Sequence, residues 1–302
     1  MSSIHKSRLA LLFLMTVLTF WCCSDDNNSQ QRPSSSSDLQ LLQEIPPSES
    51  GIQFKNQLTE NQQYNFMREQ GMLIGAGVGI LDVNNDGLQD IFFAGNMSGD
   101  KLYLNQGDFK FEDITQKAGI QQRFWSTGVA IADVNADGYD DIYLCKFLEP
   151  SPEQRRNLLY INQKDGSFKE LGQQYGLGDK GHSIMANFFD YDRDGDLDVY
   201  VANQPPNSRL YRSQYTGVND FQYTDRLYRN DGNRFIDVTE TSGIKNYSYS
   251  LSATTLDYNK DGWPDIYIAC DYEEPDFYYK NNGNGTFTNV SNEVLKLSII
   301  HI

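Results

Sequence analysis

The sequence is poor in the residues on which many enzymes and nucleic-acid-binding proteins depend. It has only three histidines and four cysteines in 302 residues, and its longest basic run is the pair Arg155-Arg156. Acidic residues outnumber basic ones by 41 to 25, which gives a formal net charge of −16. Because binding to a phosphate backbone depends on clustered Lys and Arg, this composition argues against nucleic acid as a partner.

The N-terminus has the pattern of a secretory signal. Two basic residues precede a 13-residue apolar run, Leu9 to Trp21, which ends at Cys22-Cys23. The run is shorter than the roughly 20 residues that a transmembrane helix needs. Cysteine directly after it resembles the cleavage site of bacterial lipoproteins, so we expect a signal peptide over residues 1–22 and lipidation of Cys22 or Cys23. The plainer alternative is an ordinary cleaved signal with two incidental cysteines.

The composition divides the remainder into a tether and a folded part. Residues 23–50 are rich in Ser, Gln and Asn, which is typical of a flexible tether. Residues 51–302 hold most of the 24 Gly, 19 Tyr and 17 Phe, a combination that favours short strands joined by tight turns. Cys145 and Cys270 follow strand-like runs, and we expect two buried thiols rather than a disulfide.

A nine-residue acidic motif recurs four times, as DVNNDGLQD, DVNADGYDD, DYDRDGDLD and DYNKDGWPD, starting at residues 82, 133, 190 and 257. A short apolar run precedes each copy and another follows it. Further on comes a Leu/Phe-Tyr-x-Asn element, or its Tyr-Tyr variant, then a glycine turn and a phenylalanine. This arrangement gives four strands per repeat, the signature of a propeller blade. We therefore predict an all-β fold, a β-propeller of four-stranded blades, of which four are recognisable.

Each motif has the donor pattern of a calcium loop. Positions 1, 3, 5 and 9 carry side-chain oxygens, position 6 is glycine, and position 7 can turn its carbonyl inward. Ca²⁺ takes six to eight such oxygens, so we predict about four bound ions. Solvated Asx turns without metal are the alternative, although such turns need only one or two of these residues. The predicted ligands, with position 7 acting through its carbonyl, are Asp82, Asn84, Asp86, Leu88 and Asp90; Asp133, Asn135, Asp137, Tyr139 and Asp141; Asp190, Asp192, Asp194, Asp196 and Asp198; and Asp257, Asn259, Asp261, Trp263 and Asp265.

The loops, the Leu-Tyr-x-Asn-x-Gly elements and the Asp-Ile/Val-Thr tails together resemble a known family. They are similar to the FG-GAP-like/VCBS repeat proteins of the ASPIC and UnbV type, related to cartilage acidic protein. The resemblance covers residues 51 to about 290, and it implies a propeller of about seven blades. Since only four loops are present, we expect the chain to hold part of such a propeller.

No catalytic constellation is evident, because His182 is the only histidine inside the repeats. We therefore predict a non-enzymatic, calcium-binding lipoprotein of the bacterial outer membrane, at the cell surface, that binds a protein or a glycan through its blade loops. Aromatic residues of a long loop over residues 203–225 are the best candidates for recognition. The membrane would be contacted through the lipid anchor alone. The alternatives are a lyase or hydrolase of extracellular polysaccharide that uses His182, and a structural component of a larger envelope assembly.

Overall fold

The computed structural model describes residues 42–121, 125–149, 151–205, 223–232, 234–271 and 275–295. The chain divides into two compact units, Met1–Glu44 and Ile45–Ile302, and every element below belongs to the second. Within the described residues, no helix has the length and apolar character needed to cross a membrane. Cys22 and Cys23 lie outside the described residues, as do residues 206–222 of the long loop.

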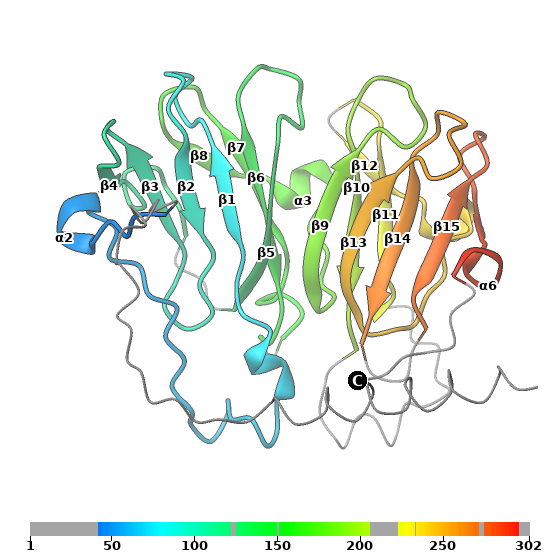
Figure 1. The fold of residues 1–302 in the computed structure, drawn as a ribbon, viewed down its shortest axis with the longest axis horizontal. Coiled ribbons are helices and arrows are strands. Elements are labelled where there is room, and N and C mark those ends of the chain that lie inside the picture. The colour runs from blue at the N-terminus through cyan, green and yellow to red at the C-terminus, as the bar shows by residue number, and fades with distance from the viewer. Residues whose placement is uncertain are drawn as a thin grey trace, which may run out of the picture. The chain divides into compact units, whose positions relative to one another are not determined.

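Within the described residues, sixteen strands form four antiparallel sheets, each with its four strands in chain order (Figure 1). The tight turns between the strands lie in the acidic and glycine-rich segments, because Asp, Asn and Gly readily adopt the backbone angles that such turns require. The first sheet holds β1 (Val78–Leu81), β2 (Asp90–Phe93), β3 (Lys101–Asn105) and β4 (Phe111–Asp113). The second holds β5 (Ser126–Ala132), β6 (Asp141–Lys146), β7 (Leu158–Asn162) and β8 (Phe168–Glu170). The third holds β9 (Ser183–Phe189), β10 (Asp198–Asn203), β11 (Arg226–Asn230) and β12 (Phe235–Asp237). The fourth holds β13 (Ser250–Leu256), β14 (Asp265–Cys270), β15 (Phe277–Asn281) and β16 (Phe287–Asn289).

Short helices stand beside the sheets. The four-residue helices α3 (Gly172–Tyr175), α5 (Thr239–Ser242) and α6 (Ser291–Val294) follow the last strands of the second, third and fourth sheets, and α2 (Pro47–Ser50) precedes the first sheet. A 3₁₀ turn, η1 (Gln70–Leu73), precedes β1. Gly176 and Gly243 end α3 and α5 in the left-handed conformation that favours glycine, whereas Leu295 ends α6 in the right-handed region.

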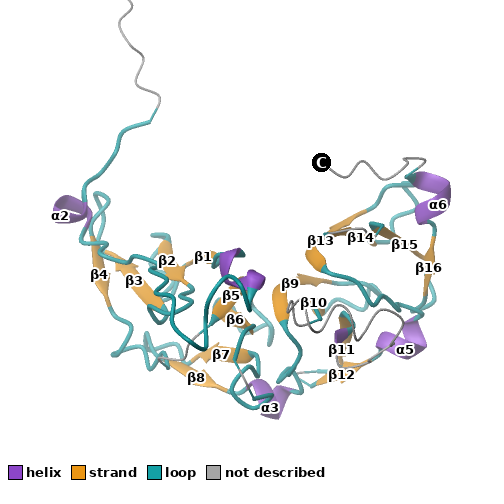
Figure 2. Ribbon diagram, turned by 90° about the horizontal axis from the view of Figure 1, so that it is seen from below, coloured by secondary structure: helices purple, strands orange, loops and turns teal. Residues whose placement is uncertain are grey.

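The sheets pack face to face through alternating residues of their middle strands (Figure 2). Phe92 and Leu102 of the first sheet meet Ile142 of the second within one buried cluster. The opposite side of the second sheet, with Tyr143, meets Val199 of the third, and Tyr200 of the third meets Ile266 of the fourth. Because successive side chains of a strand point to opposite faces, both faces of the second and third sheets are covered. Their middle strands therefore read as unbroken apolar runs.

The first strands of neighbouring sheets approach at backbone distance. The Gly77 amide donates to the carbonyl of Thr127 at 2.6 Å, and the Thr127 hydroxyl donates to the carbonyl of Ser183 at 2.7 Å. A Cβ on Gly128 would lie 2.5 Å from the carbonyl oxygen of Ile184. Only glycine permits this approach of one sheet to the next.

The prediction of an all-β fold built from four-stranded propeller blades is confirmed. Both described cysteines are free thiols, as expected, but Cys270 is half-buried rather than buried. It lies on the last residue of β14, at a register shift in the pairing with β13. The short helices after the fourth strands were not anticipated, because four residues are too few to show a helical period.

Candidate functional site

The four acidic motifs occupy one structural position, the loop between the first and second strands of each sheet. Their backbones also agree. Position 4 is left-handed in every loop, at Asn85 (φ 56), Ala136 (φ 54), Arg193 (φ 61) and Lys260 (φ 61). Position 6 is a left-handed glycine, with φ between 84 and 100. Positive φ is uncommon outside glycine, so four copies of it at one position indicate a shared, specified loop conformation.

The position 1 carboxylate organises each loop from within. In the first loop, the amide of Asp86 donates to Asp82 Oδ1 at 3.1 Å and the amide of Gly87 donates to Oδ2 at 2.8 Å. The same pair of bonds recurs at Asp133, Asp190 and Asp257. The position 5 carboxylate accepts the amide of position 7 in every loop. The side-chain oxygens of positions 1 and 5 are thereby directed into the turn.

The position 9 aspartate links the loop to the third strand. In the second sheet, Asp141 Oδ2 accepts the amide of Val134 at 3.1 Å and Oδ1 accepts the amide of Asn162 at 2.8 Å. The equivalent bonds are made by Asp90, Asp198 and Asp265, and all four aspartates are at most 1% exposed. The donor pattern predicts a metal-ligand role for position 9. The structure adds a second role, a clamp between this aspartate and the asparagine that ends the third strand. The two residues occur together in every repeat, and that recurrence could have indicated the clamp.

Burial raises the pKa of these clamping carboxyls. It raises the pKa of Asp141 and of Asp198 to about 7, opposed by the backbone hydrogen bonds and assisted by the charges of neighbouring loop aspartates. The pKa of Asp90 and the pKa of Asp265 are raised for the same reasons. The position 9 carboxyl of every loop thus resists ionisation.

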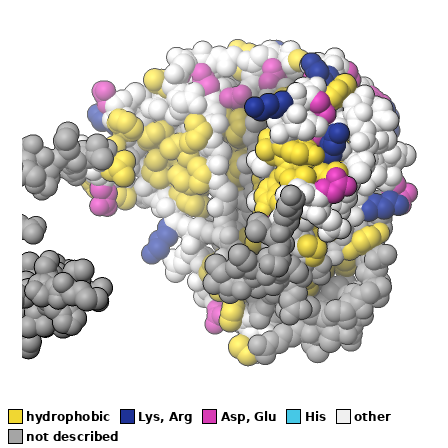
Figure 3. Space-filling model, turned by 45° about the vertical axis from the view of Figure 1, so that its right-hand side comes forward, with side chains coloured by type: hydrophobic (Ala, Val, Ile, Leu, Met, Phe, Trp, Pro, Cys, Tyr) yellow, Lys and Arg dark blue, Asp and Glu magenta, His cyan; other side chains and the backbone are white. Residues whose placement is uncertain are grey.

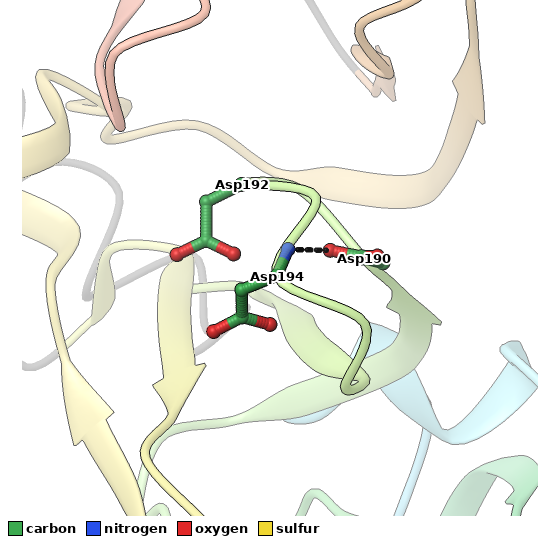
Figure 4. Close-up of side chains that lie close together, drawn as sticks. All are labelled: Asp190, Asp192 and Asp194. Atoms are coloured by element: carbon green, nitrogen blue, oxygen red, sulfur yellow. Dashed lines mark hydrogen bonds between the residues drawn. The ribbon is translucent and has the colours of Figure 1, made fainter.

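The third loop has the densest set of carboxylates. Oxygens of Asp190, Asp192 and Asp194 lie within 4.8 Å of one another (Figure 4). One buried oxygen of Asp192 and one of Asp196 have no hydrogen-bond partner among the described residues. Burial, together with the charge of Asp194, raises the pKa of Asp196 to about 6. Orphaned carboxylate oxygens suit a hard cation such as Ca²⁺, and they make the Asp196 side chain a candidate ligand that the sequence prediction, which used its carbonyl, had missed.

The loops also contact one another. Asn85 donates from Nδ2 to the carbonyl of Gly138 at 2.8 Å, which joins the first loop to the second. The Arg193 guanidinium lies over the Trp263 ring at 5.2 Å, which joins the third loop to the fourth. Lys164, in the turn between β7 and β8, forms an ion pair with Asp137 of the second loop, with 3.4 Å between Nζ and Oδ2. The structure therefore brings the predicted residues together loop by loop; metal ligation by them remains a prediction.

His182 lies away from these loops, just before β9. It is 6% exposed and packs edge-on against Phe147 at 5.4 Å. Burial, with the charge of Arg155 as a second cause, lowers the pKa of His182 to about 3. An imidazole held neutral and away from solvent is poorly placed for proton transfer to a bound polysaccharide.

A second repeated clamp, absent from the sequence prediction, lies at the other end of the sheets. In each sheet, a side-chain oxygen of the residue directly before the third strand accepts a hydrogen bond from a backbone amide at the end of the second strand or just beyond it. The four acceptors are Asp100, Asn157, Asp225 and Asp276. Asp225 also accepts from the hydroxyls of Tyr200 (2.5 Å) and Ser250 (2.7 Å). Every repeat has an Asp or Asn directly before its third strand, and this recurrence could have predicted the clamp from the sequence. Its role is to hold strands together.

Stacked four-stranded sheets, each with an acidic loop between its first two strands, define a repeat protein of the β-propeller class. The chain belongs to the FG-GAP-like repeat family. The family matches cover more than half of it, at residues 82–144, 151–201, 215–268 and 257–299.

Curated relatives agree with this assignment. The chain is 25% identical to cartilage acidic protein 1 of Homo sapiens over 158 residues (48% of this chain, 23% of that protein). It is 28% identical to cartilage acidic protein 1 of Xenopus tropicalis over 145 residues (46% and 22%), and 29% identical to integrin alpha-8 of Gallus gallus over 157 residues (47% and 15%). The matched part thus spans less than a quarter of each of these relatives.

Among solved structures, one concerns recognition of non-reducing terminal N-acetylglucosamine by an Agrocybe aegerita lectin. It aligns with a TM-score of 0.38 and 19% identity over 71% of this chain and 51% of that one. A likeness at that level supports no conclusion about the ligand of this chain.

Proposed function

We infer that the chain is a calcium-stabilised binding module, exported from the cell and held by a lipid anchor at Cys22 or Cys23 on the outer membrane of a bacterium. One observation carries this inference. Four loops share one backbone conformation and one arrangement of carboxylates, and in the third loop buried oxygens of Asp192 and Asp196 lack partners. Calcium in each loop would stabilise the junction of the first three strands of a sheet, because the position 9 clamp lies in that loop.

A binding role follows from what such a scaffold supplies. Rigid sheets joined by loops present recognition residues without needing a reactive group. The ligand class we propose is a protein or a carbohydrate. The alternative of a polysaccharide lyase or hydrolase rested on His182, whose burial and lowered pKa weaken that hypothesis.

The direct test is calcium stoichiometry together with thermal unfolding in calcium and in excess EGTA. At a free calcium concentration ten times the Kd, each site adds about 1.4 kcal/mol, so four sites add about 6 kcal/mol to the free energy of unfolding. We expect about four ions per chain and a large rise in Tm. No bound calcium and no rise in Tm would refute the metal assignment.

A matched pair of variants localises the effect. Asp194 and Asp165 each accept the amide of the residue two positions on, but only Asp194 belongs to an acidic loop. We expect Asp194→Ala to lose one bound calcium and part of the rise in Tm, whereas Asp165→Ala keeps both. Lipidation is tested separately, by incorporation of labelled palmitate into the wild type, Cys22→Ser and Cys23→Ser. Ligand binding is then sought on glycan and protein arrays with and without calcium.

A further inference from the structure

The turn between the third and fourth strands is fixed beside the acidic loop in every sheet. Each turn begins at the asparagine that ends the third strand, and the amide of this asparagine donates to the position 9 aspartate of its own loop. In three sheets the asparagine side chain also crosses the junction with the preceding sheet and donates from Nδ2 to the carbonyl of loop position 2. The pairs are Asn162 with Val83 (2.8 Å), Asn230 with Val134 (3.4 Å) and Asn281 with Tyr191 (2.8 Å).

One of these turns carries a lysine where the other three carry glycine. Two positions after the asparagine, the first, third and fourth sheets have Gly107, Gly232 and Gly283, all with positive φ. The second sheet has Lys164 there, with φ 65. Glycine adopts this left-handed conformation without steric cost, whereas lysine does not. Because residues held in such conformations cluster at functional sites, the contacts of the Lys164 side chain are informative.

The Lys164 side chain reaches the second acidic loop. Its Nζ lies 3.4 Å from Oδ2 of Asp137, the position 5 carboxylate, and donates to the backbone carbonyl of the same residue at 3.4 Å. The ammonium also lies over the ring of Tyr139, at position 7, 5.4 Å from the ring centroid. The position 5 carboxylate and the position 7 carbonyl are both predicted calcium ligands. The ammonium therefore lies beside two residues that would bind the ion.

This arrangement sets the second loop apart. Along the upper edge of the molecule in Figure 3, the end that carries the acidic loops, basic side chains lie among acidic ones. Among the described residues, however, the pair of Lys164 and Asp137 is the only ion pair that includes a predicted calcium ligand. In the first and fourth loops, the same position 5 oxygen accepts from the position 3 asparagine instead. Those pairs are Asn84 with Asp86 (3.0 Å) and Asn259 with Asp261 (2.7 Å).

We propose that Lys164 is a built-in counter-ion that makes the second loop bind calcium more weakly than the other three loops. This inference rests on the proposed function, because it requires calcium in the loops. Without calcium, the ammonium offsets the charge of Asp137. Calcium must displace it, since the ion and the ammonium compete for one carboxylate and repel each other. Three loops thus serve stability at low calcium concentrations, and the second loop responds at higher ones.

The exposure of the pair sets the size of the effect. The Lys164 side chain is 49% exposed and that of Asp137 is 23% exposed, so the pair belongs with surface ion pairs rather than buried ones. A surface pair changes an equilibrium constant by up to about fivefold. We therefore expect removal of the ammonium to raise the calcium affinity of the second loop by about that factor.

A calcium titration that reports each loop separately tests the proposal. The full-length chain is labelled with ¹⁵N-glycine and titrated with calcium in mild detergent. In every loop the position 6 glycine donates its amide to the position 1 carboxylate, so its ¹H–¹⁵N signal senses an ion in that loop. Variants that replace one position 5 aspartate at a time assign the signals. The four reporters are Gly87, Gly138, Gly195 and Gly262.

Four substitutions separate the charge of Lys164 from its backbone conformation. Lys164→Met removes the charge and keeps a long side chain, Lys164→Gly restores the residue of the other three turns, and Lys164→Arg keeps the charge. The matched control is Lys169→Met, at an exposed lysine of β8. In the wild type, Gly138 should have the highest calcium midpoint of the four reporters. Lys164→Met and Lys164→Gly should lower that midpoint about fivefold and leave the other three unchanged, whereas Lys164→Arg and Lys169→Met should change none.

The possible results distinguish this proposal from the proposed function. If no reporter glycine responds to calcium, calcium binding itself is refuted, and the counter-ion role with it. If all four respond but the Gly138 midpoint is the same in the wild type, Lys164→Met and Lys164→Gly, only the counter-ion role is overturned. A wild-type Gly138 midpoint at or below those of the other reporters would also overturn it.

Discussion

Replacement of Asn162 measures how much one sheet contributes to holding the next. Its side chain donates from Nδ2 to the carbonyl of Val83 at 2.8 Å and to that of Asp140 at 3.4 Å, and its Oδ1 accepts the amide of Lys164 at 2.8 Å. The bond to Val83 crosses to the preceding sheet, and the other two stay within one repeat. Asn105 occupies the equivalent place on the first sheet but lacks the crossing bond.

The comparison of Asn162→Ala with Asn105→Ala isolates that bond. Asn105 loses its bonds to the carbonyl of Gln89 and to the amide of Gly107, both 2.9 Å, at about 1 kcal/mol each. Asn162 loses the equivalent two and also leaves the Val83 carbonyl buried without its donor, which costs a further 1–3 kcal/mol. We therefore expect Asn162→Ala to destabilise the protein by about 2 kcal/mol more than Asn105→Ala.

The assay is urea unfolding in saturating calcium, with protein dilute enough to exclude association. The slope of the unfolding free energy against urea should be the same for both variants, so that their midpoints report stability alone. Equal losses, within about 0.5 kcal/mol, would refute the view that the crossing bond stabilises the junction.

Three further predictions concern single positions. Burial raises the pKa of Asp225 from 3.8 to about 6, so the folded protein holds this proton more tightly than the unfolded chain does. Its contribution to stability is therefore present below pH 4, falls by on the order of 3 kcal/mol as the pH rises to about 6, and is constant above that. In unfolding experiments without calcium, the free energy of unfolding should therefore depend less steeply on pH in Asp225→Asn than in the wild type. Gly176 and Gly166 both have positive φ, but a Cβ on Gly176 would lie 2.4 Å from the carbonyl oxygen of Phe235, whereas a Cβ on Gly166 would meet no atom within 4 Å. Gly176→Ala should therefore lower the Tm much more than Gly166→Ala. The imidazole of His182, with a pKa lowered to about 3, should show no titration by NMR between pH 5 and 8.

The repeats made most of the architecture predictable. An acidic motif, two apolar runs and a Leu-Tyr-x-Asn element recur in one order, so the number of strands in each sheet and the position of the loops could be inferred without coordinates. Residue identity also indicated that the carboxylates of positions 1 and 5 would lie within each turn, as their hydrogen bonds to loop amides place them. The position 9 aspartate was harder to assign, because a carboxylate that clamps amides and one that binds metal have the same letter in the sequence.

The remaining features depend on contacts between distant segments. Pro47–Ser50 lies in a segment whose composition suggested a tether, yet it forms α2, and Gly51 beside it packs against Phe111. Nothing local predicts that contact; it is evident only by comparison with the equivalent glycines of the other repeats. Likewise, His182 packs against Phe147, which directly follows β6 of the preceding sheet, and against Tyr223, which lies 41 positions further along the chain.

The crossing asparagine bonds give the array the energetics of a one-dimensional lattice. Each sheet interacts with its immediate neighbours, so its stability is the sum of an intrinsic term and the terms for the junctions it shares. Among the described residues, the second and third sheets each form two junctions, and the first and fourth sheets form one each. Amide hydrogens of β6 and β10 should therefore exchange most slowly with solvent, and loss of structure should begin at an outer sheet and spread inward, one acidic loop at a time.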